Sequence, residues 1–183
     1  MITADDVRIL LDYDPDSPMV DDGKPSKDTT LTPLNLIAAL GEFDLDPCGF
    51  VGHQTARELI VLPDDGLVLP WRGRVWLNPP YSNPLPWIKR LADHQNGCAL
   101  VLASTDTGWF QDYVAVKAAA VLFQRGRPTF YRYDMSPVGL MRATCIVAYG
   151  EENAAALANS GLKGWLACTA ELNKITKASA CVS

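Results

Sequence analysis

Apolar and polar positions alternate along most of the chain in a way that predicts helices and strands in turn. Pro33 can begin a helix with apolar positions Leu36, Ile37 and Leu40, which Gly41 ends. Short apolar runs predict the strands, which are expected at 43–46, 59–62, 74–77, 99–103, 121–123 with an extension to Tyr133, and 144–149. Helical spacing predicts the other helical segments, which are a turn at 54–58 and helices at 87–93, 109–120 and 151–159.

This order of elements predicts an α/β fold with a mostly parallel central sheet, because strands that alternate with helices form parallel units. The last two strands follow one another across a loop, so we expect an antiparallel late hairpin at one edge of that sheet.

The chain divides into three parts. They are an N-terminal helix and flexible acidic arm over 1–28, the main α/β domain over 29–150, and a C-terminal helix and tail over 151–183.

A chain of 183 residues with 48% hydrophobic and 20% charged residues is long enough for one domain with a sizeable core. No apolar stretch has membrane-spanning length and the N-terminus does not resemble a secretory signal, so we expect a cytoplasmic protein without a membrane partner. The cysteines and histidines are too few and too widely spaced to predict a metal site or a disulfide framework, and the cysteines are best explained as small buried apolar residues. They are Cys48, Cys98, Cys145, Cys168 and Cys181, with His53 and His94.

The formal net charge of −5 argues against a protein that coats nucleic acid with its whole surface, because phosphate contacts need a surplus of lysine and arginine. The basic residues are unevenly distributed, however. Arg125, Arg127, Arg132 and Arg142 lie in one stretch, where aromatic residues are interleaved with them. A local basic and aromatic face is therefore compatible with the acidic total, although arginines are by default solvated surface residues.

The tetrapeptide Asn78-Pro79-Pro80-Tyr81 is the segment that points most strongly to chemistry. It follows the strand predicted at 74–77, and open α/β sheets bind ligands at the carboxyl ends of their strands. The two prolines restrict the backbone, so the Asn78 side chain and the Pro79 carbonyl can form a pair of acceptors facing one small group. Such a pair suits an amino group with two N–H donors. The alternative explanation is a rigid proline turn that ends a strand.

Several segments, taken in order, resemble the phage-type Dam family of DNA N-6-adenine methyltransferases and, more loosely, amino-methyltransferases with an Asn-Pro-Pro-Tyr centre. The resemblance covers about residues 29–149. The segments that carry it are 32–33, 43–48, 65–67, Trp71, 75–82, 105–110 and 126–130.

The resemblance implies a Rossmann-like methyltransferase fold, S-adenosylmethionine as cofactor and double-stranded DNA as partner, in a phage or prophage protein of a bacterial cytoplasm. The catalytic residues would be Asn78, Pro79, Pro80 and Tyr81. The acceptors on Asn78 and Pro79 would bind the exocyclic amine of adenine and favour a pyramidal nitrogen with an available lone pair. Tyr81 would stack on that adenine after it has flipped out of the duplex.

The resemblance also implies a set of residues that bind the cofactor, and it implies no metal site. They are Thr32, Pro33, Asp46, Pro47, Cys48, Asp65 and Asn78. Asp46 would bind the methionine end and Asp65 would accept from the adenine amine of the cofactor. From the residues alone, each aspartate is equally well explained as a turn or capping residue.

Aromatic and basic residues after the tetrapeptide are the candidates for contact with the target base or DNA. They are Tyr81, Trp109, Phe130, Tyr131 and Arg127. Phe110, which neighbours Trp109, is better explained as a core residue.

Two other functions fit the same tetrapeptide. Related centres methylate amino groups in RNA and glutamine amides in proteins. The tetrapeptide therefore predicts the type of reaction better than it predicts whether the substrate is DNA, RNA or protein. A methyltransferase-like module that binds DNA or a partner without catalysis is the alternative of another class. That alternative predicts damage to the acceptor residues, and Asn78 to Tyr81 are intact.

Overall fold

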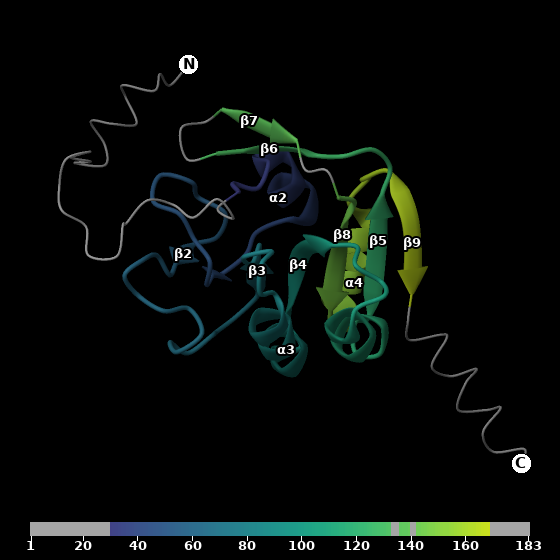
Figure 1. Cartoon of the computed structure of the whole chain (residues 1–183), viewed down its shortest axis with the longest axis horizontal. Helices are drawn as coiled ribbons and strands as arrows, with labels where there is room; N and C mark the ends of the chain where they lie inside the picture. The colour runs from purple at the N-terminus through teal and green to yellow at the C-terminus, as the bar shows by residue number, and fades with distance from the viewer. Residues whose placement is uncertain (1–29, 133–135, 140–141, 169–183) are drawn as a thin grey trace, which may run out of the picture.

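The computed structural model describes residues 30–132, 136–139 and 142–168, and a seven-stranded sheet runs through its middle (Figure 1). The strands lie in the order β2-β1-β3-β4-β8-β5-β9. Their bounds are β1 Leu45–Asp46, β2 Glu58–Leu59, β3 Val75–Leu77, β4 Gly97–Leu102, β5 Ala120–Gln124, β8 Thr144–Tyr149 and β9 Gly164–Cys168. A separate antiparallel ribbon is formed by β6 Thr129–Tyr131 and β7 Pro137–Gly139. The helices are α2 Leu34–Leu40, α3 Leu85–His94, the π-helix η2 Phe110–Ala115 and α4 Glu151–Asn159.

The helices cover both faces of the sheet, because successive side chains of each strand point to opposite sides. Val75 and Leu77 of β3 belong to the hydrophobic cluster that contains α3 and η2 residues. Trp76, between them, belongs to the second cluster, with α2 and α4 residues. All three side chains of β3 have no exposed surface. The unbroken apolar run of this strand is explained by burial on both sides.

The α/β class is confirmed, whereas the prediction of a mostly parallel sheet is wrong. The pairs β1–β2, β1–β3 and β3–β4 are parallel, and the pairs β4–β8, β5–β8 and β5–β9 are antiparallel. The sheet is therefore mixed. The predicted late antiparallel pair exists as β5 and β8, but β8 lies between β4 and β5, and β9 covers the outer side of β5.

Strand β9 lies in a segment that sequence patterns assigned to the C-terminal tail. Its five residues pair with β5 over the whole length of both strands, from Gly164 opposite Gln124 to Cys168 opposite Ala120. A Cβ on Gly164 would lie 2.3 Å from the carbonyl oxygen of Phe123, so the glycine permits this close approach. The apolar and polar residues of this segment alternate only weakly, so the sequence did not predict a strand here. Backbone hydrogen bonds to β5 stabilise it instead.

The helical turn predicted at 54–58 is absent, because this backbone pairs with the neighbouring strand. The amide of Arg57 donates to the carbonyl of Phe43 (2.9 Å), and that of Glu58 donates to the carbonyl of Asp44 (2.9 Å). The strand predicted at 59–62 consequently begins one residue earlier, at Glu58, and ends at Leu59.

The helix predicted at 109–120 ends early for a similar reason. The π-helical segment stops at Ala115, the amide of Ala119 donates to the carbonyl of Ala148 (2.8 Å), and Ala120 already belongs to β5. The strand predicted from 121 to Tyr133 is also two separate strands. β5 ends at Gln124, and Gly126 follows in the left-handed region with φ of 85°.

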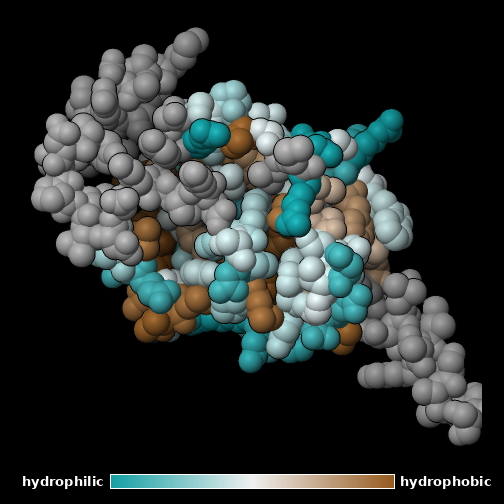
Figure 2. Space-filling view, viewed as in Figure 1, coloured by the Kyte–Doolittle hydropathy of each residue, from teal (hydrophilic) through white to brown (hydrophobic). Residues whose placement is uncertain are grey.

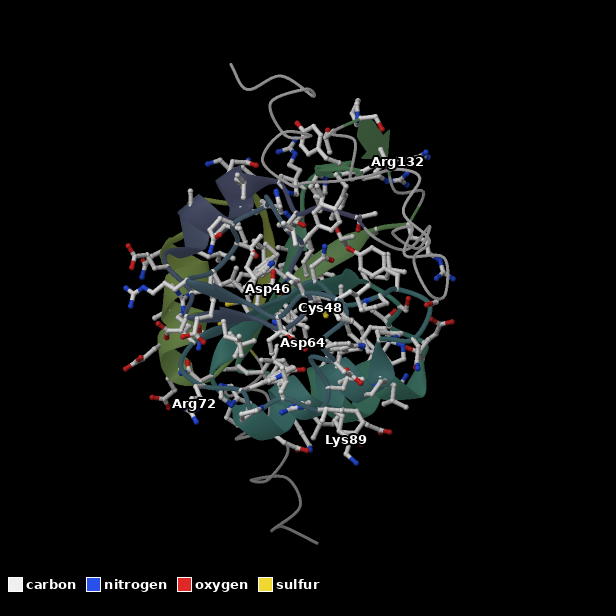
Figure 3. All side chains as sticks on the ribbon, turned by 90° about the vertical axis from the view of Figure 1, so that its left-hand side faces the viewer. Asp46, Cys48, Asp64, Arg72, Lys89 and Arg132 are labelled. Carbon is white, nitrogen blue, oxygen red and sulfur yellow. The ribbon has the colours of Figure 1, made fainter. Side chains whose placement is uncertain are left out.

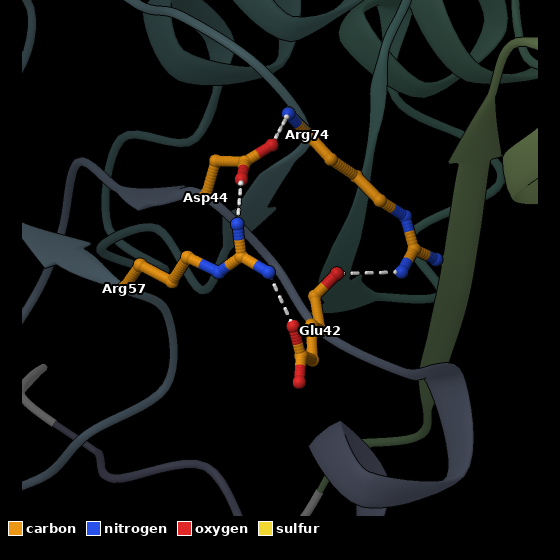
Figure 4. A network of polar contacts seen from close by, with 4 residues as sticks. All are labelled: Glu42, Asp44, Arg57 and Arg74. Carbon is orange, nitrogen blue, oxygen red and sulfur yellow. Dashed lines mark hydrogen bonds and ion pairs between the residues drawn. The ribbon is translucent and has the colours of Figure 1, made fainter.

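A polar network fixes the amino ends of β1 and β3 against each other (Figure 4). The Asp44 carboxylate accepts from the backbone amide of Arg74 (2.7 Å) and pairs with Arg57 (3.5 Å), which also pairs with Glu42 (2.5 Å). The Arg74 guanidinium donates to the carbonyls of Glu42 and Leu40 at 2.9 and 3.0 Å. These contacts set the register of the two strands whose other ends carry Asp46 and Asn78.

The N-terminal helix and acidic arm predicted over 1–28, and the tail beyond Cys168, lie outside the described residues, and the three-part division of the chain stays a prediction. Helix α4 has the bounds that the sequence predicted. Within 30–132, 136–139 and 142–168, no helix combines the length and apolar character needed to cross a membrane. In the same part of the chain, no three His, Cys, Asp or Glu side chains gather in a way that could hold a metal ion.

Candidate active site

Two parallel neighbours bring the predicted catalytic and cofactor residues to one edge of the sheet. Leu45 of β1 is paired with Val75 of β3, so Asp46 and Asn78 emerge at the same end of these strands. Figure 3 looks onto this side of the molecule and places Asp46 and Cys48 near the middle of the view. Both candidate residues therefore lie at the carboxyl ends of parallel strands, where open α/β sheets bind ligands.

The amide of Asn78 has one satisfied side and one unsatisfied side. Its Nδ2 donates to the carbonyl oxygen of Thr30 at 2.7 Å. Its Oδ1 is buried and has no hydrogen-bond partner. A buried acceptor left without a donor costs about 1–3 kcal/mol, which an arriving N–H group can recover.

Tyr81 is packed against the ribbon by a second aromatic ring. The ring of Phe130 meets that of Tyr81 edge to face, with centroids 6.5 Å apart and planes at 88°. The Tyr81 hydroxyl is buried and makes no hydrogen bond. Burial raises the pKa of Tyr81. The phenol is therefore neutral over the physiological pH range.

Asp46 is a buried carboxyl with partners on both oxygens. Its Oδ1 accepts from the backbone amide of Cys48 at 2.9 Å, and its Oδ2 accepts from the hydroxyl of Thr55. Only 3% of the residue is exposed. Burial raises its pKa from 3.8 to about 6, while the hydrogen bonds from Thr55 and Cys48 act in the opposite direction.

The loop that carries Asp65 packs directly against the turn after β1. A Cβ on Gly66 would lie 1.9 Å from the carbonyl oxygen of Pro47, so only glycine fits this contact. Burial raises the pKa of Cys48, and the carboxylates of Asp46 and Asp65 raise it further. Asp65 itself is exposed and accepts from the amide of Leu67 at 2.7 Å. The structure thus brings Asp46, Cys48 and Asp65 together.

Trp71 and the α3 residue Arg90 hold the same loop. The Trp71 indole donates to the carbonyl of Gly66 at 2.7 Å. The Arg90 guanidinium donates to the carbonyls of Leu67 and Leu69 and lies 4.8 Å from the Trp71 ring centroid. Trp71 and Arg90 thus hold the loop that carries Asp65, and the sequence did not connect Arg90 of α3 with this loop. Leu62 and Val68 on these loops stay exposed, and Figure 2 shows hydrophobic surface on that side of the molecule.

Thr32 and Pro33 are both buried, and they follow Thr30, whose carbonyl contacts Asn78. The carbonyl of Thr32 accepts from Nε2 of His53 at 2.8 Å. Burial lowers the pKa of His53, which keeps its ring neutral at pH 7, and the bond to Thr32 opposes the shift. The preceding residue, Leu31, is bridged to Tyr131 of the ribbon.

A pocket of about 320 Å³ lies beside the tetrapeptide, between the loop after β3 and the carboxyl end of β4. Tyr81 and Trp109, two of the predicted base contacts, both line it. The remaining lining residues are Ser82, Asn83, Pro84, Leu85, Leu102, Ser104, Asp106, Thr107 and Arg142. The combination of aromatic rings with hydroxyl, carboxylate and guanidinium groups suits a flat polar ligand such as a nucleobase.

A second pocket, of about 310 Å³, contains the other predicted DNA contacts, Arg127 and Tyr131. Arg125 and Lys163 contribute two more cations, and no Asp or Glu is among its lining residues. The amide of Arg125 donates to the carbonyl of Lys163 at 2.8 Å, so the backbone just before β9 lies beside that of Arg125. This basic pocket is suited to an anionic group.

Phe130 differs from the other predicted base contacts, because it has no exposed surface. It belongs to the core and supports Tyr81 from behind, so it has no face on which a base could stack. Phe110 is also in the core, as the sequence indicated.

Several residues at the site carried no signal in the sequence. Thr30 acts through its backbone carbonyl, His53 through a hydrogen bond to Thr32, and Thr55 through a hydrogen bond to Asp46. Lys163 lies in the region assigned to the tail. Arg125 and Arg142 were visible only as members of a basic stretch.

Comparison with known proteins confirms the resemblance. The family model for DNA N-6-adenine-methyltransferase (Dam) matches residues 21–154, well over half of the chain. A DNA N-6-adenine-methyltransferase of Haemophilus phage HP1 (strain HP1c1) is 36% identical over 75 residues, which cover 38% of this chain and 43% of the phage protein. The match thus spans less than half of the length of that relative. No solved structure matches the chain.

The family match includes both strands that carry the candidate site and the whole tetrapeptide between Asn78 and Tyr81. The chain therefore belongs to the Dam family of DNA N-6-adenine-methyltransferases.

Proposed function

We propose that this chain is an enzyme that transfers a methyl group from S-adenosylmethionine to the exocyclic amine of an adenine in double-stranded DNA. The observation that carries the proposal is the buried, unpartnered Oδ1 of Asn78 at the carboxyl end of β3. Family membership supports DNA and adenine as the substrate. On this proposal the mixed sheet is a variant of the Rossmann-like methyltransferase scaffold, and the protein acts in the cytoplasm of a bacterial host.

The acceptors of the tetrapeptide address the main difficulty of the reaction. The lone pair of the adenine amine is delocalised into the ring, which makes the nitrogen a poor nucleophile. Hydrogen bonds from its two N–H groups to Asn78 Oδ1 and the Pro79 carbonyl favour a pyramidal nitrogen with a localised lone pair. Pro79 and Pro80 restrict the backbone and hold these acceptors in one geometry.

The residues around β1 fit a cofactor with donor groups and a positive charge. Asp46 and Asp65 both lie close enough to Cys48 to raise its pKa, and a carboxylate oxygen keeps a further lone pair after one hydrogen bond. Asp46 would hold the ammonium of the methionine end, and Asp65 would accept from the adenine amine of the cofactor. Thr32, Pro33, Pro47 and Cys48 complete the surroundings. When bound, S-adenosylmethionine supplies an activated methyl group on its sulfonium.

The two pockets divide the contacts with DNA. The pocket beside Tyr81 would receive the flipped adenine, with Tyr81 and Trp109 as stacking surfaces. The basic pocket, with Arg127 and Tyr131, would bind the phosphodiester backbone nearby. Stacking on an aromatic ring contributes about 1–3 kcal/mol per base, which offsets part of the cost of extrusion.

The test is transfer of labelled methyl from S-adenosylmethionine to unmethylated DNA, RNA and a protein extract in parallel, followed by nucleoside and amino-acid analysis. We expect the label in N6-methyladenine from DNA. Label confined to RNA or to glutamine in protein would contradict the proposed polymer and keep the amine chemistry. Absence of both cofactor binding and transfer would favour a module that binds DNA or a partner without catalysis.

A further inference from the structure

Three successive backbone carbonyls of residues 30–32 each accept a hydrogen bond from a different part of the molecule. The carbonyl of Thr30 accepts from Asn78 Nδ2 at 2.7 Å, and that of Leu31 accepts from the amide of Tyr131 at 3.2 Å. The carbonyl of Thr32 accepts from His53 Nε2 at 2.8 Å. This segment, called here the strap, connects the catalytic tetrapeptide with the ribbon and with the loop after β1.

The contact with Thr30 decides which way the Asn78 amide faces. A carbonyl oxygen can only accept, so it selects the orientation in which the NH₂ group of Asn78 points at the strap. Oδ1 then points to the other side, where it is buried without a partner. A flipped amide would present donors to the donor groups of a substrate amine and repel it. One backbone carbonyl therefore separates the reactive orientation of Asn78 from the unreactive one.

The strap is held firmly enough to perform this selection. Leu31 and Thr32 are only 4% and 2% exposed. Leu31 exchanges two hydrogen bonds with Tyr131, donating at 2.7 Å and accepting at 3.2 Å. The ribbon residue beside Tyr131 is Phe130, whose ring supports Tyr81. The same strand β6 thus positions both functional ends of the tetrapeptide, Asn78 through the strap and Tyr81 through a ring contact.

We propose that residues 30–32 are a positioning strap, in which the Thr30 carbonyl presets the Asn78 amide for the substrate amine. The inference rests on the proposed function for its effect on catalysis. Its structural part, the fixed orientation of the amide, is testable without turnover.

Leu31→Pro is the variant that displaces the strap. Proline removes the N–H that donates to the carbonyl of Tyr131, so the segment loses one of the two hydrogen bonds that hold it to the ribbon. We expect kcat to fall about 100-fold, since a small misplacement of a reacting group has effects of this size. KM for S-adenosylmethionine and for DNA should change by less than about 3-fold, because the strap acts on the reacting amine.

Leu34→Pro is the matched control. Leu34 is the first residue of α2 and is 50% exposed, and proline is well tolerated at the first position of a helix. Its kcat should equal that of the wild type. Equal kcat values for the Leu31→Pro variant and the wild type would overturn the positioning role.

Hydrogen exchange of side-chain amides in protein labelled with ¹⁵N-asparagine reads the contact directly. We expect the Asn78 NH₂ to exchange more slowly than those of the exposed Asn35 and Asn83. The protection should vanish in Leu31→Pro and persist in Leu34→Pro. Exchange of Asn78 as fast as that of Asn35 in the wild type would overturn the proposal, whether or not the protein methylates DNA.

If the Leu31→Pro variant does not fold, which the absence of a cooperative unfolding transition would show, His53 provides a second pair of variants. His53→Ala removes the donor to Thr32, whereas His53→Gln keeps an N–H donor at the same place. We expect His53→Ala to lower kcat and speed exchange of the Asn78 amide, and His53→Gln to restore both. Failure of the wild type to transfer methyl would refute the proposed function alone, and unprotected Asn78 would refute the strap alone.

Discussion

The two sides of the Asn78 amide lie in different surroundings, which leaves its oxygen available to a substrate donor on the proposed function. The Nδ2 side is bonded to Thr30 and the Oδ1 side is buried without a partner. The sequence predicted the pair of acceptors from the proline-restricted backbone, and their role towards a substrate amine stays a prediction. The sequence did not reveal the partner on the Nδ2 side, because a backbone carbonyl 48 positions away in the chain leaves no compositional signal.

Asn78→Ala should abolish methyl transfer, with kcat reduced by at least about 100-fold, because the lost acceptor acts on the reacting amine. Cofactor affinity, measured by calorimetry, should stay within a few-fold of the wild type. Asn159→Ala, on the exposed end of α4, serves as the control and should leave both quantities unchanged. Substantial residual turnover by Asn78→Ala would contradict the assigned role.

Asp46 is expected to make stability depend on pH. Its folded-state pKa, about 6, lies above the ordinary value of 3.8, so the folded protein binds its proton more tightly than the unfolded chain does. Stability from this group is present below pH 4 and declines as pH rises towards 6, by up to about 3 kcal/mol. Asp46→Asn mimics the protonated form and should remove the decline.

Urea unfolding of the two proteins at several pH values measures this contribution. The wild type should lose free energy of unfolding relative to Asp46→Asn between pH 4 and pH 7. A constant difference across that range would show that the carboxyl is not destabilised by its burial. Cofactor affinity of Asp46→Asn at pH 7.5 should also fall, because the variant lacks the charge that would hold the methionine ammonium.

At the scale of the elements, one close contact between two loops brings the candidate cofactor residues together. The loop that carries Asp65 meets the turn after β1 at Gly66 and Pro47, and the contact leaves no room for a Cβ. The strands themselves, β1 and β3, were predictable from apolar runs. Short segments such as 54–58 were not, because pairing of the Glu58 amide with Asp44 overrides their local helical pattern.

Gly66→Ala should therefore destabilise the protein by about 1–3 kcal/mol, the usual cost of forcing extra atoms into a packed contact. Cofactor affinity should fall with it, because the Asp65 loop must move away from Pro47. Gly108→Ala is the matched control, since a Cβ there would meet nothing within 4 Å. Thermal unfolding and calorimetry compare the two variants. Equal stability of both would contradict the close packing of this contact.

The whole molecule combines an acidic total charge with a local basic pocket. The net charge of −5 excludes general attraction to DNA, whereas Arg125, Arg127 and Lys163 gather around one pocket without an acidic neighbour among its lining residues. Folding creates this concentration of charge, because β9 brings Lys163 to the turn after β5. Binding should therefore be confined to one face and sensitive to salt.

Arg125→Gln combined with Lys163→Gln should weaken DNA binding and reduce the slope of log affinity against log salt by about 1 for each phosphate that the variant no longer neutralises. Cofactor affinity should not change. Lys89→Gln, on the exposed side of α3, should leave the slope as it is (Figure 3). Fluorescence anisotropy with labelled duplex at several salt concentrations measures the slope. An unchanged slope for the double variant would place the DNA elsewhere.

The order of residues was enough to predict the α/β class and the strand that ends at the tetrapeptide, and to propose a chemistry for its acceptors. These depend on local periodicity and on residue type, which are visible along the chain. Folding in three dimensions established the mixed sheet order, the place of β9, the burial of Phe130 behind Tyr81 and the hydrogen bond between Thr30 and Asn78. These features depend on backbone pairing and on contacts between residues that are distant in sequence. Nearly every residue carries the same backbone amide and carbonyl groups, so such pairing leaves no pattern along the chain.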